Sequence, residues 1–159
     1  MATISELVQR VKDAGHSVEF FGPQDEKIID SLAAGLATDL PQAFREFLRV
    51  YGGGGIVGEW ISGIYNGQPF LKKQGSVYGD TLRWREQHHL PSGLIVVCTQ
   101  DDEVCWCTDA TNTLGTSARP VVSFDITTKP ARVTKIADSF ECFFRDYLES
   151  HSRANETST

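Results

Sequence analysis

The stretch Leu-Pro-Gln-Ala-Phe-Arg-Glu-Phe-Leu-Arg-Val-Tyr-Gly-Gly-Gly-Gly-Ile-Val-Gly, residues 40–58, contains one complete helix followed by an abrupt turn. Pro41 suits the first helical position, where a missing N–H costs nothing. Apolar side chains recur at helical spacing and form one stripe: Leu40, Phe44, Phe47, Leu48 and Tyr51. Gly52 can adopt the left-handed conformation that ends many helices. The stretch therefore predicts a helix from Pro41 to Tyr51 that packs on the rest of the chain, since so short a helix is marginal alone.

The glycines that follow match the bare dinucleotide-binding pattern at Gly53, Gly55 and Gly58. That motif needs a strand before the glycines and a helix after them, so that phosphate meets the helix N-terminus. Here the predicted helix comes first, and its C-terminal end carries a partial negative charge that repels phosphate. We interpret the glycines as a helix end and a tight turn, and we expect no bound nucleotide.

Helix and strand signals extend to both sides of this stretch. Thr3 and Glu6 form a capping box that opens a first helix ending near Gly15, and a second helix begins near Asp25. Beyond the glycines we expect strands at 59–66, 69–73, 94–99, 103–108, 121–125 and 132–136, helices at 78–89 and 138–150, and a polar loop at 111–119. The buried sides of the second and last helices are predicted to be Ile28, Ile29, Leu32, Leu36, Phe140, Phe143, Phe144, Tyr147 and Leu148.

Hairpin signals such as Asn66-Gly67 favour antiparallel pairing, and no regular strand–helix–strand alternation is present. The chain has 159 residues, which favours one domain. We therefore predict a single α+β domain over residues 1–150, with a central, mostly antiparallel sheet packed against N-terminal and C-terminal helices. Residues 151–159 are predicted to be a polar, disordered tail.

The composition excludes several classes of protein. The formal net charge of −6 argues against direct binding to nucleic acid or to anionic membranes. No apolar run approaches the roughly 20 residues that span a bilayer. The first fifteen residues have the pattern of an amphipathic helix instead of an apolar signal sequence. We expect a cytoplasmic protein whose four cysteines are reduced thiols.

Thiols and imidazoles raise the alternative of a metal site. Cys98, Cys105 and Cys107 could be combined with the His88-His89 pair, but the spacing differs from that of paired zinc knuckles. Small buried thiols explain the cysteine cluster as well. We therefore expect no metal ion and no cofactor.

A second alternative is nucleophilic catalysis by Cys142 with His151. Such a pair needs a base within hydrogen-bond reach and a third group that orients it, and no local signature of either kind is present. We expect that the protein is not an enzyme.

Two groups of residues are candidates for binding a partner. Asp101, Asp102 and Glu103 are consecutive acids in a predicted turn, where they form either a solvated tip or an acidic contact patch. Trp60, with Tyr65 and Tyr78, is either core or an exposed anchor of the kind that dominates interfaces.

Several short motifs resemble, in their order, the SUKH superfamily, which includes bacterial immunity proteins and relatives of the fungal cell-wall-assembly regulator. The resemblance runs from about Phe20 to Leu148. The motifs are Leu40-Pro41, Phe44, Glu46-Phe47-Leu48, Tyr51 before Gly52-Gly53, Thr81–Glu86, Leu90–Val97, Asp101-Asp102-Glu103 before a strand ending at Asp109, Pro120–Asp125 and Ile136–Phe143. Tyr51 stands where many members have Asn, and the glycine run is longer than usual.

The resemblance implies an α+β domain with a central antiparallel sheet and a role without catalysis. Many bacterial members are thought to neutralise a cognate toxin, often a nuclease, by binding it. Our hypothesis is therefore an immunity protein that occludes a cognate toxin protein; the alternative is an intracellular scaffold or regulatory interaction module of the same fold. The expected contacts are Gly53, Glu59, Trp60, Asp101, Asp102, Glu103 and the exposed face of the helix at 78–89. The sequence leaves the oligomeric state open.

Overall fold

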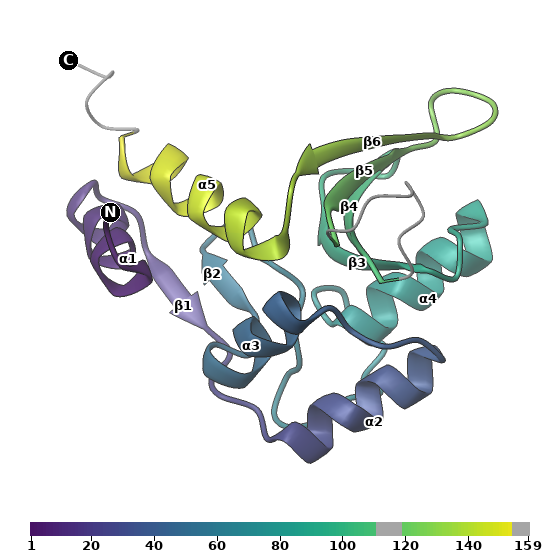
Figure 1. Cartoon of the computed structure of the whole chain (residues 1–159), viewed down its shortest axis with the longest axis horizontal. Coiled ribbons are helices and arrows are strands. Elements are labelled where there is room, and N and C mark those ends of the chain that lie inside the picture. The colour runs from purple at the N-terminus through teal and green to yellow at the C-terminus, as the bar shows by residue number, and fades with distance from the viewer. Residues whose placement is uncertain (111–118, 154–159) are drawn as a thin grey trace.

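The computed structural model describes residues 1–110 and 119–153. Helices and strands follow one another in an α+β order. The main sheet lies at one side of the molecule next to α4 and α5, and α1, α2 and α3 lie farther from it (Figure 1). The elements are α1 Ile4–Asp13, β1 Val18–Phe20, α2 Glu26–Leu36, α3 Gln42–Val50, β2 Gly54–Ile56, α4 Val77–His88, β3 Leu94–Thr99, β4 Val104–Asp109, β5 Val121–Asp125, β6 Arg132–Ala137 and α5 Phe140–Ser152.

The main sheet has the strand order β3-β4-β5-β6, and every neighbouring pair is antiparallel. A separate two-stranded sheet pairs β1 with β2, and Glu19 lies opposite Gly55. The predicted fold class is confirmed. β6, which covers the strand predicted at 132–136, lies at the edge of the main sheet.

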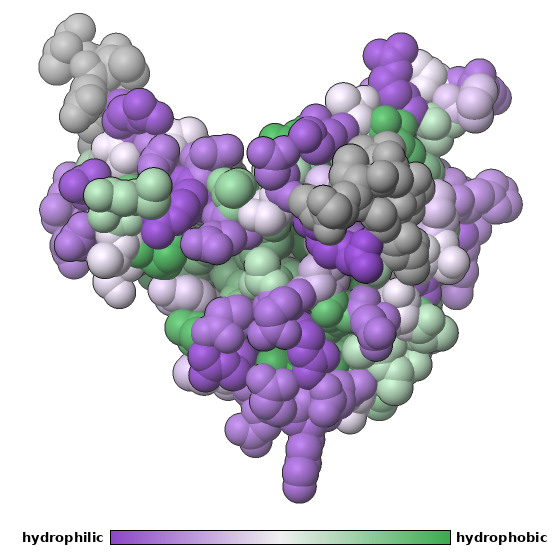
Figure 2. Space-filling model, viewed as in Figure 1, coloured by the Kyte–Doolittle hydropathy of each residue, from purple (hydrophilic) through white to green (hydrophobic). Residues whose placement is uncertain are grey.

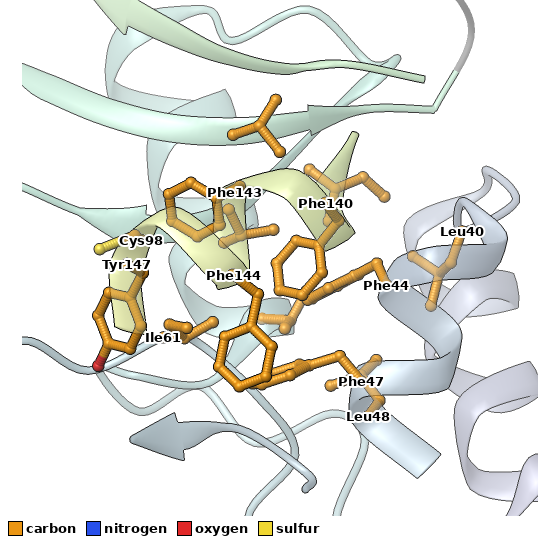
Figure 3. Packing of buried hydrophobic residues seen from close by; sticks show 14 of the residues in the cluster. Leu40, Phe44, Phe47, Leu48, Ile61, Cys98, Phe140, Phe143, Phe144 and Tyr147 are labelled. Carbon is orange, nitrogen blue, oxygen red and sulfur yellow. The ribbon is translucent and has the colours of Figure 1, made fainter. Parts of the chain in front are cut away.

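The larger core joins α3 to α5 through stacked and tilted aromatic rings. The ring of Phe140 lies 4.9 Å from that of Phe44 and 5.0 Å from that of Phe47, and Phe144 lies 5.0 Å from Phe47. Figure 3 shows these side chains of α5 facing those of α3. Every residue predicted for the inner side of α5 is buried, because a 3.6-residue period places all of them on one face.

A smaller core lies on the other face of the sheet. Trp84 of α4 packs against Phe124 of β5, with ring centroids 6.2 Å apart. The remaining buried members are Leu90, Leu94, Val96, Cys105, Cys107 and Val122. The main sheet is therefore covered on both faces, which explains why β3 is an apolar run without alternation.

The glycine run forms the turn that the sequence predicts, and it also contains strand β2. Gly52 has a φ of 78° and its N–H donates to the Phe47 carbonyl, which ends α3. Gly53 has a φ of 121°, and a Cβ there would lie 2.5 Å from the Cα of Gly63. The run is glycine-rich because two backbone segments touch here and leave no volume for a side chain.

Two predicted strands are wrong, and two observed strands, β1 and β2, were not predicted. Residues 59–66 form only isolated bridges at Ile61, Gly63 and Tyr65, because no continuous partner strand runs beside them. Residues 69–73 contain no strand. Asn66 and Gly67 do form the predicted turn, with φ values of 52° and 67°.

The two ends of the predicted domain differ slightly from expectation. α5 continues to Ser152, so the first residues of the predicted tail are helical. The predicted loop at 111–119 lies mostly outside the described residues, as does the tail from residue 154 onward. Within residues 1–110 and 119–153, no helix is long and apolar enough to span a membrane.

Candidate functional site

A groove of about 890 Å³ runs between α5, the end of β6 and the β3–β4 hairpin. The segment 58–62, which follows the glycine run, closes its remaining side. Figure 2 shows the molecule hollowed at its upper edge, between the side that carries α1 and α5 and the projecting β5–β6 hairpin. Trp60, Trp106, Phe143 and Tyr147 give the groove an aromatic lining.

Tyr147 connects α5 to the segment that follows the glycines. Its hydroxyl accepts a hydrogen bond from the Ile56 N–H at 2.7 Å and donates to the Glu59 carbonyl at 2.8 Å. Gly55 makes room for this hydroxyl, because a Cβ there would lie 2.7 Å from it. Burial raises the pKa of Tyr147, so the phenol stays protonated and structural.

The side chains of Glu59 and His151, which both line the groove, are in direct contact and form an ion pair when the imidazole is protonated. The His151 ring also lies 5.5 Å from that of His16 and 5.4 Å from that of Tyr147. Together these contacts join the N-terminal loop, the segment after the glycines and the last turn of α5 at one position.

Trp60 is the most exposed aromatic side chain of the groove, with 37% of its surface accessible. Its ring rests against Phe21 at 5.9 Å, and Phe21 in turn contacts Tyr65 at 4.7 Å. Trp106 is half-buried and packs edge-to-face on Phe143 at 5.6 Å. Trp60 and Trp106 therefore line the groove from segments that are far apart in the sequence.

Asp80 of α4 lies buried beneath the groove and is hydrogen-bonded on several sides. Its carboxylate accepts from the Ser62 hydroxyl at 2.7 Å and from the Gly75 N–H at 3.2 Å, and it pairs with Arg83 at 3.0 Å. Burial raises the pKa of Asp80, and these donors oppose the rise. Its contacts hold the 62–75 segment against α4, so we assign it a structural role.

The three clustered cysteines are divided between the two faces of the sheet. Cys105 and Cys107 point into the smaller core with their sulfurs 3.6 Å apart. Cys98 belongs to the larger core, where it lies near Tyr147 (Figure 3). The three cysteines that the zinc alternative combines as ligands are therefore not on the same face of the sheet. Among the described residues, no three His, Cys, Asp or Glu side chains are placed to hold a metal ion.

Cys98 lines the groove but is a poor nucleophile. Burial raises its pKa to about 12, although Gln100 donates a hydrogen bond to its sulfur at 3.2 Å. A thiol with so high a pKa stays protonated near neutral pH. Cys142, the other candidate, is exposed near the start of α5, and nine residues of helix, about 13 Å, separate it from His151.

The acidic turn lies next to the groove, directly after Gln100. One carboxylate oxygen of Asp101 accepts hydrogen bonds from the N–H groups of Glu103 and Val104, at 2.7 and 2.8 Å. Asp101 therefore holds the shape of the turn, which is the structural role that turns commonly give to Asp. Asp102 and Glu103 are exposed at its tip.

The structure brings some of the predicted contact residues together and separates others. Glu59 and Trp60 line the groove, and the acidic turn continues from its lining residues Thr99 and Gln100. Gly53 is buried between Gly63 and Phe21, so we leave it out of the proposed contact surface.

The lining residues that the sequence did not predict as contacts include Trp106, Asp146 and His151. A signal for Trp106 was present, because in a strand it must point away from its neighbours Cys105 and Cys107. Asp146 lies next to the predicted buried residues of α5. No local sequence pattern indicates that this position faces the groove.

The fold and the groove define a small α+β domain built on an antiparallel sheet, with an aromatic-lined surface open to a partner. A family model described as SUKH_5, SMI1-KNR4 cell-wall, matches residues 4–149. The chain belongs to this family, which confirms the resemblance drawn from the ordered motifs. The family includes immunity proteins and is generally not catalytic.

Proposed function

We propose that the protein is an immunity protein that binds a cognate toxin domain and neutralises it by occlusion. The observation that supports this proposal most is the groove, because it places Glu59, Trp60 and the neighbouring acidic turn on one surface. Exposed Trp side chains in a concave, mostly apolar surface are typical anchors of protein interfaces.

The charge of the protein fits a basic partner such as a nuclease. The net charge is −6, and Asp102 and Glu103 project from the turn beside the groove. Complementary charge speeds the encounter of two proteins more than it tightens the final complex. In this proposal the protein acts in the cytoplasm, catalyses nothing and works by covering the surface that the toxin needs.

The direct test is co-expression with the toxin domain encoded beside this protein. We expect the intact protein to restore growth and to co-purify with that domain. Trp60→Ala should weaken binding by about 2 kcal/mol, close to 30-fold, because an exposed Trp anchor is lost. The matched control is Phe70→Ala, which also removes an exposed aromatic ring but lies outside the groove.

Absence of rescue by the intact protein would count against toxin neutralisation and would favour a regulatory interaction module of the same fold. Equal effects of Trp60→Ala and Phe70→Ala would mean that the toxin binds outside the groove. The proposal of toxin neutralisation would still stand.

A further inference from the structure

The groove contains a carboxylate that has no ion-pair partner among the described residues. Asp146 is exposed on α5 and forms no ion pair with any residue that the structure describes. By contrast, Glu59 is paired with His151, and the buried Asp80 is paired with Arg83. Asp146 is therefore the acidic group in the groove that is available to a partner.

The cations near the groove are already engaged. The Lys73 ammonium lies over the ring of Tyr65, 4.6 Å from its centroid, and Tyr65 does not line the groove. His151 is held by Glu59. An incoming cation thus finds, in a mostly apolar groove, a carboxylate that no described residue pairs with, while the lining cation Lys73 rests on the ring of Tyr65.

Two indoles accompany that carboxylate. Phe143 links Trp106 to Asp146, because its ring packs on Trp106 and it lies one helical turn before Asp146 on α5. The Trp60 carbonyl lies 3.5 Å from the sulfur of Cys98, and Cys98 is the register partner of Trp106. Trp60, Trp106 and Asp146 all line this groove.

An arginine side chain matches this combination of groups. Its guanidinium is planar, stacks on aromatic faces and donates two parallel hydrogen bonds to a carboxylate. Resting on the proposed function, we propose that the groove binds an arginine side chain presented by the toxin, with its guanidinium stacked against Trp60 and Trp106 and paired with Asp146. A lysine would pair with Asp146 but would gain less from the two indoles.

The test uses the full chain and a small probe, N-acetyl-arginine methylamide, and follows the indole N–H signals by NMR. The chain has three tryptophans, and Trp84 is buried in the smaller core, which makes it an internal control. We expect saturable shifts at Trp60 and Trp106 and none at Trp84. The citrulline analogue, which has the same shape without the charge, should produce no saturable shift.

A matched pair of variants on α5 tests the carboxylate. Asp146→Asn should weaken binding of the arginine probe about three-fold, as expected for an exposed ion pair. Glu141→Gln removes a charge from the same helix outside the groove and should leave binding unchanged. Retained NMR dispersion of both variants verifies that each is folded.

The arginine assignment is overturned by an equal response to the citrulline analogue or to N-acetyl-lysine methylamide, by an equal shift at Trp84, or by equal effects of the two variants. Growth rescue by the intact protein without arginine binding would reject this inference and leave toxin neutralisation standing. Arginine binding without growth rescue would support the arginine site and reject toxin neutralisation.

Discussion

Gly53 and Gly58 both have a positive φ, but only Gly53 lacks room for a side chain. A Cβ at Gly53 would lie 2.5 Å from the Cα of Gly63, whereas a Cβ at Gly58 would meet open space. The same residue type in one run therefore serves two purposes, close approach of two backbones and a turn.

Alanine substitution at the two positions separates these purposes. Gly53→Ala should lower the free energy of unfolding by more than about 3 kcal/mol, because backbone strain is added to a steric clash. Gly58→Ala should cost about 1 kcal/mol, from the positive φ alone. Urea unfolding measures both values, and similar losses would contradict the close contact with Gly63.

Because of Cys98, the stability of the protein is expected to fall as the pH rises in the alkaline range. Its thiol has an ordinary pKa of 9.0, and burial raises this value to about 12 in the folded state. Between these values the unfolded thiol loses its proton while the folded thiol keeps it. This contribution to stability is complete below pH 9 and is lost as the pH rises, by up to about 1.4 kcal/mol per pH unit.

Cys98→Ala should reduce this slope of unfolding free energy against pH above pH 9, whatever constant loss the small cavity adds. Cys142→Ala, which removes an exposed thiol, is the matched control variant. The measurement is urea unfolding at several pH values, and an unaltered slope in Cys98→Ala would show that this thiol is not the titrating group.

At the scale of elements, α3 and α5 depend on each other. Neither helix would be stable alone in water, and the aromatic side chains of Figure 3 bury the apolar face of each against the other. Phe140 lies at the centre of this contact, within 6.2 Å of the rings of Phe44, Phe47, Phe143 and Phe144.

Phe140→Ala should destabilise the protein by about 3–5 kcal/mol, because it leaves a cavity between the two helices. Phe70→Ala should cost less than about 1 kcal/mol, since 52% of that side chain is exposed. Thermal or urea unfolding compares the two. A loss below 1 kcal/mol for Phe140→Ala would mean that α3 and α5 are held together by other contacts.

At the scale of the whole molecule, the net charge of −6 predicts how the proposed toxin complex forms. Its association rate should fall as salt is added, because screening weakens long-range attraction to a basic partner. Neutralising the acidic turn with Asp102→Asn and Glu103→Gln should lower the association rate more than it raises the dissociation rate.

The control for this double variant is Asp25→Asn with Asp39→Asn, which removes the same charge from the two ends of α2. Surface plasmon resonance at two salt concentrations compares the variants. If both double variants slow association equally, only the total charge matters and the acidic turn has no special place in the encounter.

The elements that could be predicted are those whose signals are local. The helix after Pro41, the capping box at Thr3 and the strand 94–99 each carry their start, period and end within a dozen residues. The predicted strand at 59–66 was wrong because strand formation depends on a partner, and β2 instead takes the residues before it, opposite β1.

The sequence by itself determined the helices, the antiparallel pairing of β3–β4 and the family, because short-range periodicity, capping, turn chemistry and motif order are written in neighbouring residues. Only the tertiary structure decided which residues share a surface. The groove joins Trp60, Trp106 and Asp146 from three distant segments, and the sheet separates Cys98 from the other clustered thiols. The relative placement of such segments depends on how the helices and the sheet pack, and no single segment contains that information.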